Sequence, residues 1–160
     1  MAITTGDIKG SYPLPGYNYK VVIGELTLGF TEVSGLQIAV EQVIFKQSPS
    51  KDKSVGPEIL FMPGQGTPSI LTMKRGVILG TKTTLRYLYN WISEIKANVV
   101  EKRDVFVYLM DEVGTEIVGW KAINAFPTSL DAPSFSASSN DAALETVVLM
   151  ADNIQMLDLS

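Results

Sequence analysis

The segment from Gly119 to Ala151 constrains the fold more than any other part of the chain. Trp120 to Phe126 is a mostly apolar run typical of a strand, and Pro127 and Pro133 prevent it from closing as a tight hairpin. Small turn-forming residues from Ser134 to Asp141 predict a long loop, because serine, asparagine and aspartate satisfy the backbone locally. Leu144 to Met150 is a second apolar run. The segment therefore predicts a strand, a loop and a second strand.

Short apolar or alternating runs, separated by turn residues, fill most of the remaining chain. Alternation at period two predicts half-buried strands, and Gly24-Glu25 and Asp111 to Gly114 predict hairpin turns between them. Pro63-Gly64 predicts the end of the strand that precedes it. Further strands are expected at residues 17–23, 26–30, 36–45, 59–62, 70–74 and 105–110. The apolar pattern at 115–123 overlaps the run from Trp120 to Phe126 and belongs to the same strand.

One segment, from about Thr83 to Ala97, has helical periodicity. Its apolar side chains fall on a single stripe, while most polar ones lie off that stripe. The residues of the stripe are Leu85, Leu88, Tyr89, Ile92 and Ile95. About eight strands with one inserted helix predict a mainly β fold, an antiparallel sandwich or barrel. By its length the chain is expected to be one domain over residues 1–160, with residues 1–16 as a proline-stiffened lead-in arm.

The predicted strand from Leu36 to Phe45 carries apolar residues on both of its faces. Such a strand either lies inside a sandwich or has its second face covered by something else, because an exposed one would invite edge pairing with other chains. We expect a neighbouring subunit to cover the second face. Val43 and Phe45 are candidate contact residues for that interface.

Residues 46–58 form the one long polar segment that is rich in proline, glycine and serine. An extended surface loop is expected there, and loops of this length are uncommon unless they are functional or disordered. Its ordering would cost conformational entropy, so we expect an ordered loop to be held by a partner molecule, through exposed ion pairs and one small apolar contact. The candidate residues for that contact are Lys51, Asp52, Lys53, Val55 and Glu58.

The composition excludes most enzyme classes. The chain has no cysteine and no histidine, so disulfides, thiolate nucleophiles, zinc sites of the Cys/His type and the usual general base are excluded. Its 17 acidic residues show no metal-loop spacing. A glycine-rich stretch at 64–69 lacks the third glycine of a dinucleotide fingerprint, and Pro68 prevents a helix from starting there. We therefore expect no catalytic residues, no cofactor and no metal.

Charge and hydropathy narrow the possible partners. The net charge of −4 argues against a nucleic-acid-binding surface, and no apolar run approaches the ~20 residues of a membrane span. No signal peptide is expected at the amino terminus. Charged residues make up 19% of the chain, against ~25% in typical soluble domains, and hydrophobic residues make up 46%. This balance is compatible with a surface partly covered by a partner, and equally with an ordinary domain that has few surface charges.

Four stretches, in order, carry a resemblance to a known family. They are Tyr-Pro-Leu-Pro at 12–15, Phe-Thr-Glu-Val-Ser-Gly-Leu at 30–36, Phe-Met-Pro-Gly-Gln at 61–65 leading to Leu-Thr-Met-Lys-Arg-Gly-Val at 71–77, and Asn-Ala-Phe-Pro-Thr-Ser-Leu through Ala-Ala-Leu-Glu at 124–145. With them the chain resembles the inner tail-tube proteins of contractile phage tails. It resembles the tube proteins of phage-tail-like contractile injection systems more closely still.

The resemblance implies a structural role without catalysis. It implies hexameric rings that stack into a hollow tube inside a contractile sheath. The implied partners are further copies of the chain, the sheath protein, baseplate hub and tube-terminating proteins, and a payload of protein or DNA in the lumen, with no membrane contact. Assembly in the bacterial cytoplasm is implied, within an extracellular or membrane-docked particle or a virion tail. Residues 46–58 depart from the family pattern, because this linker is enlarged.

Two alternatives stay open at this point. The first is a baseplate hub or initiator ring of the same family. The second is a carbohydrate-binding or hydrolytic β-sandwich that uses paired carboxylates and exposed aromatic residues, which the number of acidic residues permits.

Overall fold

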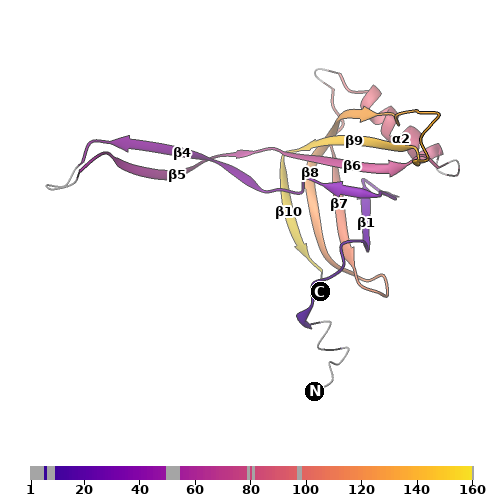
Figure 1. Cartoon of the computed structure of the whole chain (residues 1–160), viewed down its shortest axis with the longest axis horizontal. Helices are drawn as coiled ribbons and strands as arrows, with labels where there is room; N and C mark the ends of the chain where they lie inside the picture. The colour runs from indigo at the N-terminus through magenta and orange to yellow at the C-terminus, as the bar shows by residue number, and fades with distance from the viewer. Residues whose placement is uncertain are drawn as a thin grey trace.

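The computed structural model describes residues 6, 10–49, 55–78, 80, 82–96 and 99–159. The predicted fold class is confirmed, since antiparallel strands dominate and one helix, α2 (Lys82–Ser93), lies among them (Figure 1). The strands are β1 (Tyr19–Ile23), β2 (Leu26–Leu28), β3 (Glu32–Ser34), β4 (Ala39–Gln47), β5 (Glu58–Thr67), β6 (Ser69–Gly76), β7 (Arg103–Met110), β8 (Glu116–Asp131), β9 (Leu144–Ala151) and β10 (Asn153–Asp158).

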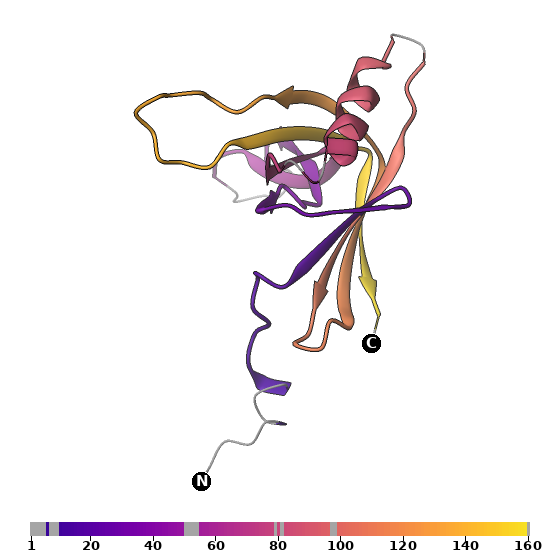
Figure 2. The same ribbon diagram turned by 90° about the vertical axis from the view of Figure 1, so that its right-hand side faces the viewer.

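Eight of these strands form one sheet, in the order β2-β1-β7-β8-β9-β6-β3, with β10 also paired to β8. The strand β8 is long enough to take part in two layers of the sheet, one with β7 and β10 and the other with β9. Along one edge it pairs with β7, and along the other it pairs first with β10 and then with β9. The sheet bends where these partners change. Figure 2 shows the result, with β1, β7, β8 and β10 running downward while β9 and the β8–β9 loop extend to the side.

Asn124 forms the corner in β8 at which the sheet bends. Its φ of 54° places it in the left-handed region, which asparagine tolerates better than most residues. The backbone N–H of Asn124 donates to Asp104 Oδ1 at 3.0 Å, and its Nδ2 donates to Asp152 Oδ2, also at 3.0 Å. The corner is thus tied to β7 on one side and to the β9–β10 junction on the other.

The strand does not end at Phe126, the last residue of the run that was predicted to be extended. The strand β8 continues to Asp131, with Pro127 opposite Leu149 and a register shift between Pro127 and Ser129. Pairing with β7 extends only to Ala125, so Pro127 stands where one neighbouring strand has ended and where the ladder is irregular. A strand tolerates proline at such edge and bulge positions, because no regular ladder hydrogen bond needs its missing N–H.

The core lies between the two layers and α2. The alternation along β6 illustrates this arrangement. Leu71 and Met73 point into the core and are fully buried, whereas Ile70 points outward and is 55% exposed. The buried apolar side chains are Val21, Ile23, Leu28, Leu71, Met73, Leu88, Trp91, Val105, Val107, Ala122, Ala125, Val147, Leu149, Ala151 and Ile154. Each of the two layers contributes its inward-facing positions at period two.

The helix is shorter than predicted, and its buried face is rotated from the predicted stripe. It ends at Ser93, and Leu88 and Trp91 are its buried residues, whereas Tyr89 from the predicted stripe is 63% exposed. The indole Nε1 of Trp91 donates to the Glu101 carbonyl at 2.7 Å, which satisfies its polar group inside the core. The described part of the chain contains no helix long and apolar enough to cross a bilayer.

Candidate functional site

The strands β4 and β5 pair only with each other and project from the body as a narrow hairpin (Figure 1). We call this hairpin, residues 39–47 and 58–67, the arm. The expected placement of this strand inside a sandwich is wrong, because the arm lies apart from the two layers. The strand also begins at Ala39 rather than at Leu36.

The two strands of the arm are longer than predicted where they meet the segment that connects them. The strand β4 extends to Gln47 and β5 begins at Glu58, so three residues of the predicted loop 46–58 belong to strands. Nor does β5 end at Pro63-Gly64, since it continues to Thr67. Neither strand of the arm has a second neighbour, so a proline there removes no hydrogen bond from a sheet interior. At Gly64 a side chain would fit only tightly, because a Cβ there would lie 3.0 Å from the Glu41 carbonyl oxygen at the register shift in β4.

Both faces of the arm are apolar. Residues that are paired across the strands share a face. One face carries Val43, Phe45, Leu60 and Met62, followed by the pair Gln47 and Glu58, and the other carries Ile44, Ile59 and Phe61 together with Lys46. With Val40 nearer the body, the exposures of the arm's large apolar side chains run from 45% for Val43 to 71% for Phe61.

The exposed apolar surface of the arm has energetic consequences. A hairpin of two strands is marginally stable in water at best, and soluble monomers rarely expose contiguous apolar patches of this kind. If each of the eight side chains loses its exposed half to a partner, the gain is on the order of 10 kcal/mol before the cost of association. Contact with a partner on both faces would therefore remove a large apolar surface from water.

The root of the arm fixes the direction in which it projects. Gly35 has a φ of 91°, and a Cβ at this position would lie 2.0 Å from the Ile70 carbonyl oxygen, so no other residue fits without a backbone shift. The hydroxyl of Ser69 donates to the Gln37 carbonyl at 2.6 Å, and that of Thr67 donates to the Ala39 carbonyl at 3.0 Å. Both strands of the arm are thus held where they leave the body.

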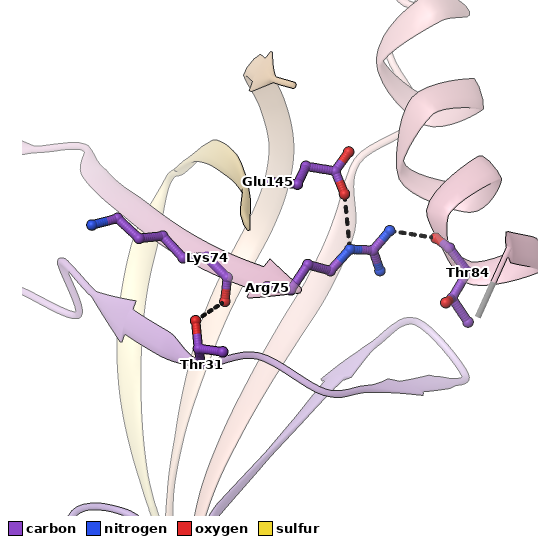
Figure 3. A network of polar contacts seen from close by, with 5 residues as sticks. All are labelled: Thr31, Lys74, Arg75, Thr84 and Glu145. Atoms are coloured by element: carbon purple, nitrogen blue, oxygen red, sulfur yellow. Dashed lines mark hydrogen bonds and ion pairs between the residues drawn. The ribbon is translucent and has the colours of Figure 1, made fainter. Parts of the chain in front are cut away.

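A buried ion pair anchors β6, the strand into which β5 leads. Arg75 is 5% exposed, and its Nε contacts Glu145 Oε2 of β9 at 3.0 Å while its Nη2 donates to the Thr84 carbonyl of α2 at 3.1 Å (Figure 3). On the opposite side of β6, the Thr31 hydroxyl donates to the Lys74 carbonyl at 3.1 Å. The arm is therefore attached to a strand that is fixed to its neighbours and to the helix.

The structure brings together some of the predicted contact residues. Val43, Phe45 and Glu58 lie on one face of the arm, and Gln47 Nε2 donates to Glu58 Oε2 at 2.9 Å. Val55 lies in the connection and is 100% exposed. Lys51, Asp52 and Lys53 fall outside the described residues.

Sequence reasoning missed the β5 half of the apolar surface. The residues concerned are Ile59, Leu60, Phe61 and Met62. They were assigned to a short separate strand that ended at Pro63. The available signal was the pair of short apolar runs, 43–45 and 59–62, on either side of a turn-rich segment, which is the pattern of a hairpin.

No metal or catalytic cluster emerges within the described residues, where no three His, Cys, Asp or Glu side chains are grouped so that they could hold a metal ion. Two phenols, those of Tyr19 and Tyr108, have a raised pKa, chiefly because burial disfavours the charged form and secondarily because Glu32 and Glu116, respectively, lie nearby. The ammonium of Lys20 lies near Tyr108 and partly offsets the rise in its pKa, but the pKa of both phenols is raised, so both stay protonated at neutral pH.

Comparison with known proteins assigns the chain to a family. The family model described as T4-like virus tail tube protein gp19 matches residues 15–155. A chain of the sheath–tube complex of an extracellular contractile injection system in its extended state is 36% identical, with a TM-score of 0.85, and the match covers 99% of this chain and 100% of that one.

Two further solved structures extend the comparison. A chain of the anti-feeding prophage cap is 38% identical, with a TM-score of 0.81 and 99% of both chains covered. Hcp1 from Flavobacterium johnsoniae, at 17% identity and a TM-score of 0.53 over 89% of this chain and 99% of that one, shares the fold. Curated protein sequences yielded no match. The chain belongs to the T4-like tail tube family and is a tail tube protein of the contractile injection system type.

Proposed function

We propose that the chain is the repeating subunit of hexameric rings that stack into a hollow tube, and that the arm makes the principal contact between subunits. The observation that carries the proposal is the arm itself, which projects from the body with large apolar side chains on both faces. A hairpin covered on two faces needs either two neighbours or one neighbour that surrounds it. Repeated copies in a tube supply both possibilities.

The partners follow from the relatives. One relative is a chain of a sheath–tube complex, and others are chains of a tube-terminating cap, of a sheath/tube terminator and of a six-fold symmetrised baseplate. These names support a contractile sheath, a terminator and a baseplate as partners, and support six subunits per ring. The lumen conducts a payload of protein or DNA. We place assembly in the bacterial cytoplasm, before the tube functions in an extracellular or membrane-docked particle or a virion tail.

The main tube is favoured over the baseplate initiator ring. The matched baseplate chain is 18% identical with a TM-score of 0.74, whereas the sheath–tube chain is twice as similar in sequence. The role is non-enzymatic, because chains of this family build a tube and the sequence offers no histidine or cysteine for catalysis. A carbohydrate-binding or hydrolytic sandwich would require a different family.

The contact residues divide into two groups along the arm. Val43 and Phe45 bury apolar surface against a neighbouring subunit, because they lie on the same face as Leu60 and Met62. Toward the connection, Lys51, Asp52, Lys53 and Glu58 pair across the junction between rings, and Val55 makes a small apolar contact. Exposed pairs contribute only ~0–1 kcal/mol each, but every copy in a ring repeats them. The single domain over residues 1–160 presents both groups.

The test is assembly of the purified protein with and without a charge on the arm. Negative-stain microscopy should show rings or tubes for the parent. Val43→Asp should remain folded by circular dichroism but elute as a monomer, since an unpaired carboxylate in an apolar contact costs several kcal/mol. A matched control is Val113→Asp, at an 81% exposed position in the turn between β7 and β8. A parent that stays monomeric at all concentrations would contradict the proposal, as would a Val43→Asp variant that assembles like the parent.

A further inference from the structure

An apolar hollow opens in the body beside the root of the arm. Its volume is about 300 Å³, and its walls include Tyr19 of β1, Val33 of β3, Leu109 of β7 and Trp120 of β8. Leu36, three positions before the arm begins, also lines it. Of these side chains, Tyr19, Val33, Leu36 and Trp120 are only partly buried and pack against the core cluster, so the hollow is a continuation of the core that this chain does not fill.

We propose that this hollow receives the side chain of Phe61 from the arm of a second copy of the chain. The inference rests on the proposed function, because it specifies the surface against which the arm packs. It goes beyond that function by naming a knob and the socket that accepts it.

The positions of the knob and the socket favour a contact between copies. Phe61 lies in the middle of β5, and the stretch from Thr67 to Phe61 spans about 20 Å at the rise of a strand. The arm extends away from the body and its root is fixed by Gly35 and Ser69, so the arm cannot fold back onto its own hollow (Figure 1). A knob at one end and a socket at the other form a heterologous contact, which propagates into rings or stacks.

The chemistry of the socket matches a phenyl ring. Phe61 is the most exposed large apolar side chain of β4 and β5, at 71%. A buried aromatic ring removes 150–250 Å² from water, and such rings seated in pockets dominate interface energies. The hydroxyl of Tyr19 is already used, since it donates to the Phe30 carbonyl at 2.6 Å, so its ring rather than an unpaired polar group faces the hollow.

The rim of the socket is polar and satisfied within the body. Glu32, which also lines the hollow, has its Oε2 3.3 Å from Lys74 Nζ. An entering apolar side chain therefore leaves no charge without a partner. An apolar centre surrounded by a polar rim is the usual anatomy of a protein interface. The same arrangement disfavours a charged occupant, because a charge would enter the apolar centre without a partner there.

The absence of native cysteine makes cross-linking a direct test, because introduced thiols have no background. The pair Val33→Cys and Ile59→Cys, which keeps Phe61 and places the second thiol on the same face of the arm, is made in the full chain, and assembled protein is treated with a short bis-maleimide. We expect covalent dimers and higher multimers on denaturing gels. The matched control pair replaces Val33→Cys with Val99→Cys, at a 67% exposed valine just before β7, at the opposite end of that strand from Leu109. This control should give almost no multimers.

The outcomes separate this inference from the proposed function. Rings or tubes in the microscope, combined with no more cross-linking of the Val33 pair than of the Val99 pair, would overturn the socket while leaving the tube intact. A protein that never forms rings or tubes would overturn both. Phe61→Ala provides a second measurement, because the loss of a buried ring should raise the concentration needed for assembly roughly 10- to 100-fold. An unchanged assembly concentration for Phe61→Ala also counts against the socket.

Discussion

The body and the arm contain the same kinds of apolar residue, but the body buries these residues and the arm exposes them. In β6 the burial alternates, with Leu71 and Met73 sealed in the core and the residues between them facing outward. In β4 no residue is buried, although the apolar content is comparable. The comparison teaches that apolar content alone does not mark a core. A strand with one apolar face belongs to its own domain, whereas a strand with two apolar faces and no second layer needs another molecule.

The largest expected difference comes from placing the same charge in each region. Leu71→Asp puts an unpaired carboxylate into the core and should unfold the protein at room temperature, because the penalty of several kcal/mol is comparable to total stability. Val43→Asp in the arm should leave the melting temperature of the monomer nearly unchanged. Circular dichroism melts of the two variants measure the contrast. If Leu71→Asp melts like the parent, the assignment of core and arm is reversed.

A second contrast compares a buried ion pair with an exposed one. Glu145→Ala leaves the 5% exposed Arg75 without its carboxylate and should destabilise the fold by about 3 kcal/mol. Glu32→Ala removes the partner of Lys74 on the outer side of the same strand, where both side chains are more than 40% exposed, and should cost less than about 0.5 kcal/mol. Urea unfolding in the Val43→Asp background would measure both without interference from assembly. Equal losses in the free energy of unfolding for Glu145→Ala and Glu32→Ala would show that the ion pair between Arg75 and Glu145 does not anchor β6.

The smallest contrast concerns two glycines with positive φ. At Gly35 the added methyl group of Gly35→Ala meets the Ile70 carbonyl oxygen, so the loss should be about 2 kcal/mol, through left-handed strain and a shift of the arm's root. At Gly56, in the connection, φ is also positive but nothing lies within 4 Å of the added methyl group, so Gly56→Ala should cost about 1 kcal/mol or less. Thermal melts rank the two variants. A larger loss at Gly56 would contradict the assigned role of the root.

Period-two and helical patterns in the sequence predicted most of the elements, since such patterns depend on residues close together in the chain, but they did not predict β3 or β10. They identified the strands around Val21, Leu71, Val107 and Leu149 and the existence of the helix, and they marked the segment 36–45 as apolar on both faces. The absence of cysteine and histidine excluded most catalytic chemistry. The ordered set of short stretches from 12 to 145 was enough to predict the family.

Only the tertiary structure decided where the strands end, which helix face is buried and where the arm projects, because each of these depends on contacts between residues far apart in the chain. Whether a proline ends a strand depends on the partner opposite it, and both Pro63 and Pro127 stand at edge or bulge positions that tolerate one. Which face of α2 is buried depended on the surface that receives Trp91. The apolar runs at 43–45 and 59–62 fit a hairpin, but only the pairing of β4 with β5 showed that they form one. The direction of the arm is set at its root, by the close approach of Gly35 to Ile70 and by the hydrogen bonds of the Ser69 and Thr67 hydroxyls, and no local pattern encodes these contacts.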